Sequence, residues 1–490
     1  MADADIARAA LDAIARADGL DYADARVVRS ERDHLSVRDG TVDRAQRAHS
    51  AGIGVRALVR GAWGFAAEPD PSPAAAERAA RRALAIARGV AAAARDRVRL
   101  AEEEPQRGHY ATPVAVDPFA VPLDRRVADL VAATDAARDG GDPRVRAVEA
   151  SMQWHRIDSA LATTEGTLVT QNRVFGGAGL AVTCRDGDAT ARRSYPIDYD
   201  GGLWAAGYEV VDELALVDHA HRLREEALEL LSAPDCPAGR RALVLDTPQL
   251  ALQIHESCGH PAECDRALGD EVSLAGASFL TPDRLGRFHY GSPRVNLTAD
   301  ATTPRGLGTF GWDDEGVPAR RTPLVSRGVF VGYLSSRETA EALGLGRSAG
   351  CMRAESWDRP PIIRMINVSL EPDPDGPASL DELIADTDDG VLMTVNRSWS
   401  IDDLRLNFQF SCEVGWEIAR GRRTRMVRNP LYTGSTPAFW RGCDAIGNAT
   451  AWRIWGLASC GKGDPMQAMG VAHGCAPARF RDVEIGCSRG

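Results

Sequence analysis

A strand that passes directly into a helix, near residue 247, constrains the fold of this chain more than any other feature. Residues 242–246 form an apolar, strand-like run. Thr247 and Pro248 follow, and this pair is typical of a helix N-cap with proline at the first helical position. The sequence therefore predicts that a helix begins here.

The predicted helix has one apolar side and one side that holds polar groups. Leu250, Ile254 and Cys258 recur every four residues, so one face is apolar and is expected to pack on the core. His255 and Glu256 lie on the other side of the helix. These two side chains are therefore available for chemistry.

Two histidines follow each other at a spacing of five residues. In the zinc-protease signature His-Glu-x-x-His the histidines share one helix face because they are four residues apart. His255 and His260 would lie roughly 140° apart around an ideal helix, too far for both imidazoles to reach one ion. Gly259 permits unusual dihedral angles and Pro261 disfavours α geometry at His260, so we expect His260 to leave the helix or to follow a wide turn back toward His255. A buried helix with two hydrogen-bonded histidines is the alternative interpretation.

This stretch, His-Glu-x-x-x-His followed by Pro-x-Glu at residues 255–263, resembles the motif of the TldD/PmbA family of metalloproteases. Four further stretches resemble segments of that family: residues 52–56 (Gly-Ile-Gly-Val-Arg), 311–319 (Gly-Trp-Asp-Asp-Glu-Gly-Val-Pro-Ala), 364–367 (Arg-Met-Ile-Asn) and 460–462 (Cys-Gly-Lys). Together they span nearly the whole chain. One branch of the family keeps the metal motif and a sister branch, PmbA or TldE, lacks it. This chain is similar to the metal-bearing branch.

The metal site needs a donor beyond the two histidines. A catalytic zinc usually has three protein ligands and one position open to water. Spacing alone does not choose the third ligand: Cys258 and Cys264 are nearer in sequence, with packing on the core as the alternative role for both. The acidic residues 313–315 are also candidates, or they form a turn whose carboxylates accept backbone hydrogen bonds. The resemblance implies that Cys460 is the third ligand and that the ion is zinc, with iron as the alternative.

Other residues near these ligands have expected roles. Glu256 is placed to take a proton from the attacking water and to pass it to the leaving amine. Glu263, three residues after His260, is expected to hydrogen-bond a ligand imidazole, with a surface carboxylate as the alternative. Lys462 is the only lysine in a chain whose Lys and Arg residues number 58. We expect it to neutralise a charge on the substrate or to hold the segment around Cys460. Further candidate donors to the substrate are His289, Tyr290 and His473.

The alternation of strand and helix patterns predicts an α+β fold in two domains. The boundary is expected at residues 232–239, a short segment with two prolines and a glycine. Residues 1–232 are predicted to form an N-terminal α+β domain with an antiparallel sheet. Residues 240–490 are dense in strand-like runs, which indicates a β-rich, sandwich-like or barrel-like C-terminal domain that contains the metal-site helix.

Several local predictions accompany this division. The first strands are expected at 24–31, 34–38, 41–48 and 51–59, separated by turn signals such as Asp39-Gly40. Helices are expected from Ser72-Pro73 to about Arg88 and over about 123–138. Residues 101–118 are predicted to be an exposed connection and residues 212–232 a single helix. The glycine-rich stretch around Cys460 is predicted to be a loop framed by strands.

The composition narrows the classes of function. The net charge of −11 argues against binding along a nucleic-acid backbone, which needs clustered Lys and Arg. No run approaches the ~20 apolar residues of a membrane span, and the alanine-rich N-terminus with acidic residues differs from a signal peptide. We therefore expect a cytoplasmic protein without nucleic-acid or membrane partners. The ten cysteines show no disulfide-like spacing, so reduced thiols are expected.

The metal motif and the family resemblance together predict a zinc-dependent peptidase. The resemblance implies that it hydrolyses peptide bonds in unfolded polypeptides or peptides. The resemblance implies a dimer around an inner cavity, either a homodimer or a heterodimer with a metal-free family member. An extended substrate is expected to add a strand beside a sheet edge near His255, with weak sequence preference. Two alternatives are a non-catalytic, metal-stabilised partner subunit and a modulator of another protein, such as a DNA enzyme. Glu256 argues against the first, because a structural metal site needs no general base.

Overall fold

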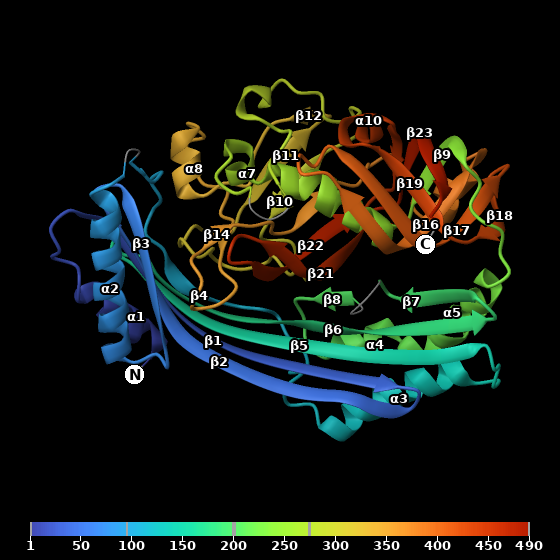
Figure 1. Cartoon of the computed structure of the whole chain (residues 1–490), viewed down its shortest axis with the longest axis horizontal. Helices are drawn as coiled ribbons and strands as arrows, with labels where there is room; N and C mark the ends of the chain where they lie inside the picture. Colours follow the sequence, from blue (N-terminus) through green and yellow to red (C-terminus); the bar gives the residue numbers. More distant parts are fainter. Residues whose placement is uncertain (1, 95–96, 198–201, 273–275, 489–490) are drawn as a thin grey trace.

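Four long antiparallel strands form the floor of the molecule in the computed structural model, which describes residues 2–94, 97–197, 202–272 and 276–488. Each strand has 19 residues, and the two hairpins pair with each other through β1 and β5. Figure 1 shows them as a curved sheet with the second half of the chain on its concave side. They are β1 (Leu20–Arg38), β2 (Thr41–Val59), β5 (Val145–Thr163) and β6 (Leu168–Asp186).

The prediction of four short strands before residue 60 is therefore wrong in number. β1 and β2 are one continuous hairpin that turns at Asp39 and Gly40, as the Asp-Gly pair indicated. The polar residues around 30 and 49 looked like strand ends in the sequence. They stay in the ladder because this part of the hairpin is exposed on its surface and accepts polar side chains on both faces.

Shorter strands complete the sheet, in the order β22-β21-β8-β6-β5-β1-β2-β3 with β4 and β7 also paired to β6. β4 lies inside the predicted connection 101–118 and pairs in parallel with β6, so this segment is not a simple linker. The added strands are β3 (Ala62–Pro69), β4 (Arg107–Ala111), β7 (Ala189–Tyr195), β8 (Gly202–Trp204), β21 (Arg453–Lys462) and β22 (Gln467–Cys475).

Helices cover the outer side of this sheet, where their alanine-rich and leucine-rich faces bury apolar area. The predicted helix 212–232 is broken in two, because Ala215 takes a left-handed conformation with φ 45° between α4 and α5. Ser72 caps α2 by accepting a hydrogen bond from the Ala75 amide, as the Ser-Pro pair predicted. The helices are α1 (Asp3–Asp12), α2 (Pro73–Ala91), α3 (Leu123–Arg138), α4 (Glu209–Leu214) and α5 (Leu216–Leu230).

A closed β-barrel forms the core of the second half. The strands follow the order β16-β9-β23-β19-β17, and the ring closes because β16 also pairs with β17; β18 and β20 extend it at β17 and β23. The barrel-like alternative of the predicted fold is therefore the one observed. These strands are β9 (Gly239–Leu245), β16 (Asp389–Ile401), β17 (Asn407–Ala419), β18 (Arg422–Val427), β19 (Pro430–Ser435), β20 (Cys443–Ile446) and β23 (Ala478–Cys487).

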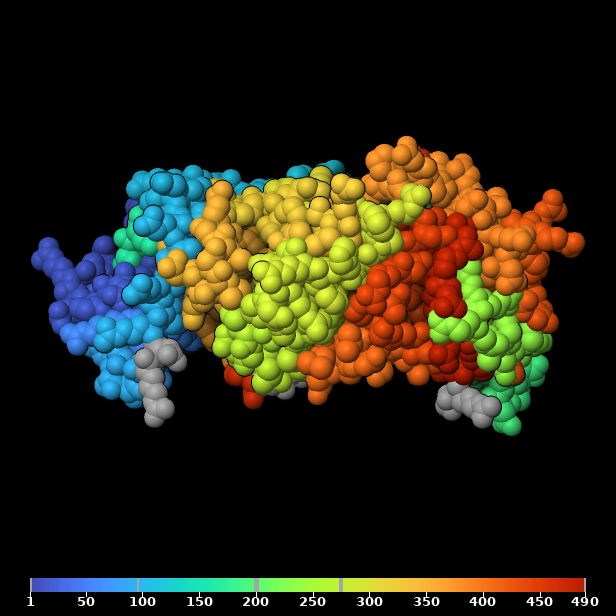
Figure 2. Space-filling model, turned by 90° about the horizontal axis from the view of Figure 1, so that it is seen from above, coloured from blue at the N-terminus to red at the C-terminus, as the bar shows by residue number. Residues whose placement is uncertain are grey.

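Short elements fill the space between barrel and sheet. β9 passes directly into α6 (Thr247–Ile254), followed by a π-helix at His255–Gly259 and a 3-10 turn at His260–Ala262. The others are α7 (Cys264–Leu268), α8 (Arg337–Ala342), α9 (Leu380–Ala385), α10 (Thr436–Arg441), the 3-10 turn Pro282–Arg284, β10 (Leu297–Asp300), β11 (Arg321–Ser326), β12 (Val329–Phe330), β13 (Met352–Arg353), β14 (Ile362–Ile363) and β15 (Val368–Leu370). Seen from above in Figure 2, these segments and the barrel spread over the sheet, and the blue N-terminal part projects at one end.

The two halves of the chain share a sheet and several buried ion pairs. β21 of the second half pairs with β8 of the first half at Gly456 and Leu203. Strands from both sides of the predicted boundary at 232–239 therefore belong to one ten-stranded sheet. Arg56 Nη2 lies 2.6 Å from Asp24 Oδ2, and Arg56 Nη1 lies 3.5 Å from Glu315 Oε1. Two of the motifs quoted above, 52–56 and 311–319, therefore contact each other through Arg56 and Glu315 and join the second half of the chain to the sheet.

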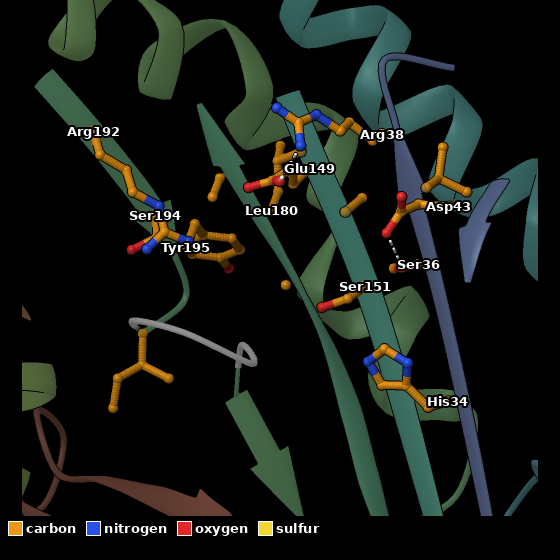
Figure 3. Close-up of a pocket in the computed structure, with 15 residues that line it drawn as sticks. His34, Ser36, Arg38, Asp43, Glu149, Ser151, Leu180, Arg192, Ser194 and Tyr195 are labelled. Atoms are coloured by element: carbon orange, nitrogen blue, oxygen red, sulfur yellow. Dashed lines mark hydrogen bonds and ion pairs between the residues drawn. The ribbon is translucent and has the colours of Figure 1, made fainter. Parts of the chain in front are cut away.

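A small polar pocket of about 180 Å³ lies between β1, β2, β5, β6 and β7. Figure 3 shows Arg38 turned toward Glu149, with Nη1 3.6 Å from Oε1, and Ser36 turned toward Asp43, to which it donates at 3.4 Å. None of the metal-motif histidines lines it. The metal-motif histidines lie instead at the end of α6.

Candidate metal centre

A π-turn brings His255 and His260 to the same side of the chain. The backbone N–H of His260 donates to the carbonyl of His255, five residues earlier, and the two imidazole centroids lie 4.7 Å apart. A π-turn inserted in a helix is rare and is found frequently at functional sites. We expected His260 either to leave the helix or to follow a wide turn, and the structure contains the wide turn. His260 keeps α geometry, with φ −58° and ψ −44°, despite the proline after it.

Close packing around Gly259 explains why the turn needs this residue. A Cβ atom at this position would lie 1.9 Å from the Sδ atom of Met365. The apolar side of the helix, which includes Leu250 and Cys258, is buried as predicted. Asp246 rather than Thr247 is the N-cap of α6, and its side chain accepts a hydrogen bond from the Thr247 amide at 2.7 Å.

Cys460 joins the two histidines to form a buried donor cluster. One donor atom each of His255, His260 and Cys460 lies within 4.8 Å of the others, and Cys460 Sγ is 3.6 Å from His260 Nε2. It is the one such group of at least three His, Cys, Asp or Glu side chains within the described ranges. Cys460 lies in strand β21 and not in a loop, and Arg364 donates to its carbonyl oxygen.

The outward nitrogen of His255 is held by a second histidine. His255 Nδ1 lies 2.9 Å from His473 Nε2, and His473 Nδ1 lies 2.8 Å from the carbonyl oxygen of Val368. A carbonyl only accepts, so His473 carries its proton on Nδ1 and accepts at Nε2. His255 must then donate from Nδ1, which leaves the lone pair of its Nε2 free for a metal ion. His473 is thus an orienting partner and not a substrate donor.

The outward nitrogen of His260 is held by a carboxylate. His260 Nδ1 lies 3.0 Å from Glu263 Oε2, which also accepts from Arg266 Nε at 2.8 Å. Lys462 Nζ lies 3.5 Å from the other oxygen of Glu263, 2.8 Å from Asp265 Oδ1 and 2.7 Å from the Ile363 carbonyl oxygen. Lys462 and Glu263 are both completely buried. The structure therefore places Glu263 beside the imidazole of His260 and Lys462 behind Glu263.

Charges around the cluster favour the metal-binding forms of its side chains. Burial lowers the pKa of His255 to about 4, so its imidazole is neutral at neutral pH. Burial alone would raise the pKa of Cys460, but His260 and Arg364 outweigh it and hold the pKa below its usual value. Burial raises the pKa of both Cys258 and Cys264 to about 12. Of these three thiols, only Cys460 is shifted toward the thiolate that binds metals.

Glu256 projects beside the cluster and pairs with a cation from a distant segment. Its carboxylate accepts a short hydrogen bond from Arg405 Nη1, and both side chains are buried. Arg405 lies in the turn between β16 and β17, 149 residues from Glu256. Sequence reasoning missed it because a single arginine among so many arginines gives no signal.

The other candidates from the sequence have different partners. Asp313 accepts from the amides of Glu315, Val317 and Met352 at 2.9 to 3.0 Å, so residues 313–315 form a hydrogen-bonded turn. Tyr290 is buried and donates to the Ser257 carbonyl at 2.6 Å. His289 is exposed. These residues are not part of the donor cluster.

Comparison with protein families decides the membership of the chain. The PmbA/TldA metallopeptidase C-terminal domain matches residues 239–486, domain 1 matches residues 23–87 and the central domain matches residues 116–231. The chain belongs to the TldD/PmbA family. The donor cluster lies within the part that matches the C-terminal domain of TldD/PmbA proteins.

Relatives from three archaea support this membership. A metalloprotease of Methanothermobacter thermautotrophicus is 29% identical over 475 residues, which are 96% of each chain. A zinc metalloprotease TldD homolog of Saccharolobus solfataricus is 23% identical over 310 residues, 63% of this chain and 64% of the relative. The crystal structure of TldE from Thermococcus kodakarensis has a TM-score of 0.74 at 16% identity and covers 98% of this chain and 99% of its own. The last likeness shows the fold of this TldD/PmbA protein.

The donor set of the cluster fits zinc. Two imidazole nitrogens and one thiolate are ligands that Zn²⁺ prefers, and three protein ligands leave the fourth position open. Both outward imidazole nitrogens have partners, as is usual for metal-bound histidines. His255, His260 and Cys460 are therefore the residues that would hold the ion.

Proposed function

We propose that this TldD/PmbA protein is a zinc-dependent peptidase that hydrolyses peptide bonds in unfolded polypeptides. The observation that supports it is a buried set of two histidines and a low-pKa cysteine with a carboxylate, Glu256, beside them. A metal site with only a structural role does not need that carboxylate. The names of the metalloprotease and zinc-metalloprotease relatives agree with this chemistry.

Each residue has a distinct role in this proposal. Zinc bound by the donor cluster would polarise the scissile carbonyl and increase the acidity of water. Glu256 takes the proton of the attacking water on its carboxylate and gives it to the nitrogen of the leaving amine. His473 and Glu263 keep the two imidazoles oriented through their outward nitrogens. Lys462 stabilises Glu263 and so acts behind the site and not on the substrate.

An extended peptide is the substrate that we propose. β22 contains His473, which contacts the donor cluster, but its outer edge next to His473 is already bonded to residues 366–369, so the substrate would pair with another strand near His255. A segment added beside a strand near His255 would be bound by main-chain hydrogen bonds, with weak sequence preference. A folded domain offers no free strand for this pairing.

The proposed setting is cytoplasmic and dimeric, as a homodimer or with a metal-free family member. In the described ranges no helix is both long and apolar enough to cross a membrane. A non-catalytic, metal-stabilised subunit or a modulator of another protein is the competing function. The buried Glu256 disfavours the non-catalytic subunit, because a structural metal site needs no general base.

The test offers one polypeptide to the zinc-loaded protein in a folded and in a destabilised form, with fragments followed by mass spectrometry. We expect cleavage of the destabilised form alone, and cleavage that is slower by at least about 100-fold in Glu256→Gln. Equal cleavage of both forms would contradict strand addition. No cleavage of either form by fully zinc-loaded protein, alone and with a metal-free family member, would contradict the peptidase function.

A further inference from the structure

The turn that contains Arg405 is fixed at several points. The Arg405 amide donates to the Asp402 carbonyl at 2.9 Å, and the Arg405 carbonyl accepts from Thr436 Oγ1 at 2.9 Å. Asp402 also accepts from the amide of Leu406 at 2.7 Å. Arg405 itself has φ 62°, a left-handed conformation that is uncommon for arginine. Several contacts therefore hold the backbone in the orientation that directs this guanidinium inward.

The same turn is tied to the metal ligand His260. Arg266, which bonds Glu263 beside His260, also donates from Nη1 to the carbonyl of Gly276 at 2.8 Å. Gly276 packs so closely on Asp403 that a Cβ atom would lie 2.1 Å from the Asp403 carbonyl oxygen. The Phe279 amide donates to the Leu404 carbonyl at 3.0 Å. The segments that hold Glu256 and His260 are thus connected through one continuous set of contacts.

Glu256 needs a fixed partner because of where it lies. It is the second residue of the π-turn and is only 5% exposed. A buried carboxylate without a partner is strongly unfavourable, and a free glutamate has several rotamers that point its oxygens in different directions. Arg405, with 3% of its side chain exposed, is the one ion-pair partner of Glu256 among the described residues. An arginine fork stays charged and gives directional hydrogen bonds.

We propose that Arg405 is a positioning residue for catalysis: it holds the carboxylate of Glu256 in the orientation that receives the proton from water. This inference rests on the proposed peptidase function. Arg405 acts through Glu256 and not through zinc, so its removal leaves the three ligands in place. Removal of the Arg405 side chain should therefore lower kcat, and it should have no such effect when Glu256 can no longer act as a base.

The test is a double-mutant cycle of Arg405→Ala and Glu256→Gln in the zinc-loaded protein. Arg405→Ala should lower kcat about 100-fold, the scale of loss that misplacement of a reacting group causes, with KM changed little and zinc content unchanged. In the Glu256→Gln background the same change should lower kcat less than about two-fold. Methylguanidinium should restore part of the kcat of Arg405→Ala but not of the double variant.

Arg193→Ala is the matched control, because Arg193 is also buried and pairs with a buried glutamate, Glu413, at 2.6 Å. It should lower the melting temperature and leave kcat unchanged. Equal losses of kcat from Arg405→Ala in both backgrounds would overturn the inference. So would a wild-type kcat in Arg405→Ala. If Arg405→Ala does not fold, Arg405→Lys is used in its place. It should lower kcat when Glu256 is present and leave kcat unchanged when Glu256→Gln is present.

A stability cycle separates this inference from the peptidase function. Arg405→Ala should lower the melting temperature of the metal-free protein more when Glu256 is present than in the Glu256→Gln background. Equal shifts in both backgrounds overturn the inference whether or not the wild type cleaves peptides. If the wild type with full zinc cleaves nothing, alone and with a metal-free family member, the peptidase function fails and Arg405 has no catalytic role to support.

Discussion

The donor cluster and the turn at residues 313–315 both gather metal-binding types of side chain in the interior, and they use their polar atoms in opposite ways. Asp313 accepts three backbone hydrogen bonds, and Glu315 accepts from the Arg337 amide at 2.9 Å and pairs with Arg56. Within the donor cluster the partners occupy only the outward nitrogens, so one atom of each side chain faces the other two.

This difference shows why residue type alone does not define a metal site. Carboxylates that accept backbone amides stabilise a turn and offer few remaining lone pairs to an ion. Imidazoles whose second nitrogen is bonded are held with the first nitrogen available. The hydrogen-bond partners of each polar atom therefore distinguish the donor cluster from the turn at residues 313–315, although both were candidate metal sites in the sequence.

The largest effect is expected from Glu256→Gln, which tests whether the donor cluster is catalytic at all. The ligands remain and only the proton-transfer group is lost, so kcat should fall by several orders of magnitude, about 10²-fold to 10⁴-fold from general base catalysis alone. Zinc content should not change. Glu413→Gln, at another buried glutamate, is the control and should keep its rate. Peptide cleavage by Glu256→Gln near the wild-type rate would show that Glu256 is not the base.

Asp313→Ala tests the other side of the comparison. Three buried backbone amides would lose their acceptor, so the free energy of unfolding should fall by roughly 3 kcal/mol or more, while zinc content stays at the wild-type level. Chemical denaturation and metal analysis measure the two quantities. Asp381→Ala, at a side chain that is 80% exposed, should change neither. Loss of zinc from Asp313→Ala would place this turn at the metal site.

The pH dependence of the metal-free protein sharpens the comparison. The folded-state pKa of His255 is about 4, below its unfolded value of about 6.5, because burial disfavours the charged ring. The unfolded chain binds a proton in this window and the folded chain does not, so His255 contributes a loss of stability of up to about 3 kcal/mol as the pH falls from 6.5 to 4. His255→Gln should therefore weaken the pH dependence, whereas His221→Gln, at an exposed ring, should not. An identical slope in wild type and His255→Gln would contradict this explanation.

The smallest effect is expected from Lys462→Arg. Lys462 is completely buried between Asp265, Glu263 and the Ile363 carbonyl, and a larger guanidinium should overpack this space at a cost of about 1–3 kcal/mol. The shift behind Glu263 should also weaken zinc binding. Arg453→Lys, at an exposed position of the same strand, is the matched control. Unchanged stability and zinc content in Lys462→Arg would show that the lysine is incidental.

Local patterns predicted much of the fold. The helix at 123–138 matches α3, and the Ser-Pro start of α2 is capped as expected, because these signals depend on neighbouring residues. The length of β1 and β2 was not predictable in this way. Their polar middle sections are kept in the ladder by pairing along the whole hairpin and with β5, which is a long-range effect.

The candidate site was predictable only in part. The five-residue spacing required a distortion at His260, and the π-turn supplies it. Cys460 is 200 residues from His260, so only the family resemblance pointed to it. His473 and Arg405 act through contacts between distant strands, and no local pattern marks such residues. Sequence periodicity places side chains on faces of one element and does not report which elements meet.

The most direct test of the donor cluster is the zinc content of purified wild type, Cys460→Ala and Cys258→Ala, measured after equilibration with zinc and removal of free ion. We predict about one zinc per chain in the wild type and in Cys258→Ala, because the Cys258 thiol packs against the core and stays protonated. Cys460→Ala should lose most of its zinc. Equal zinc content in wild type and Cys460→Ala would contradict the assignment of His255, His260 and Cys460 as the metal site.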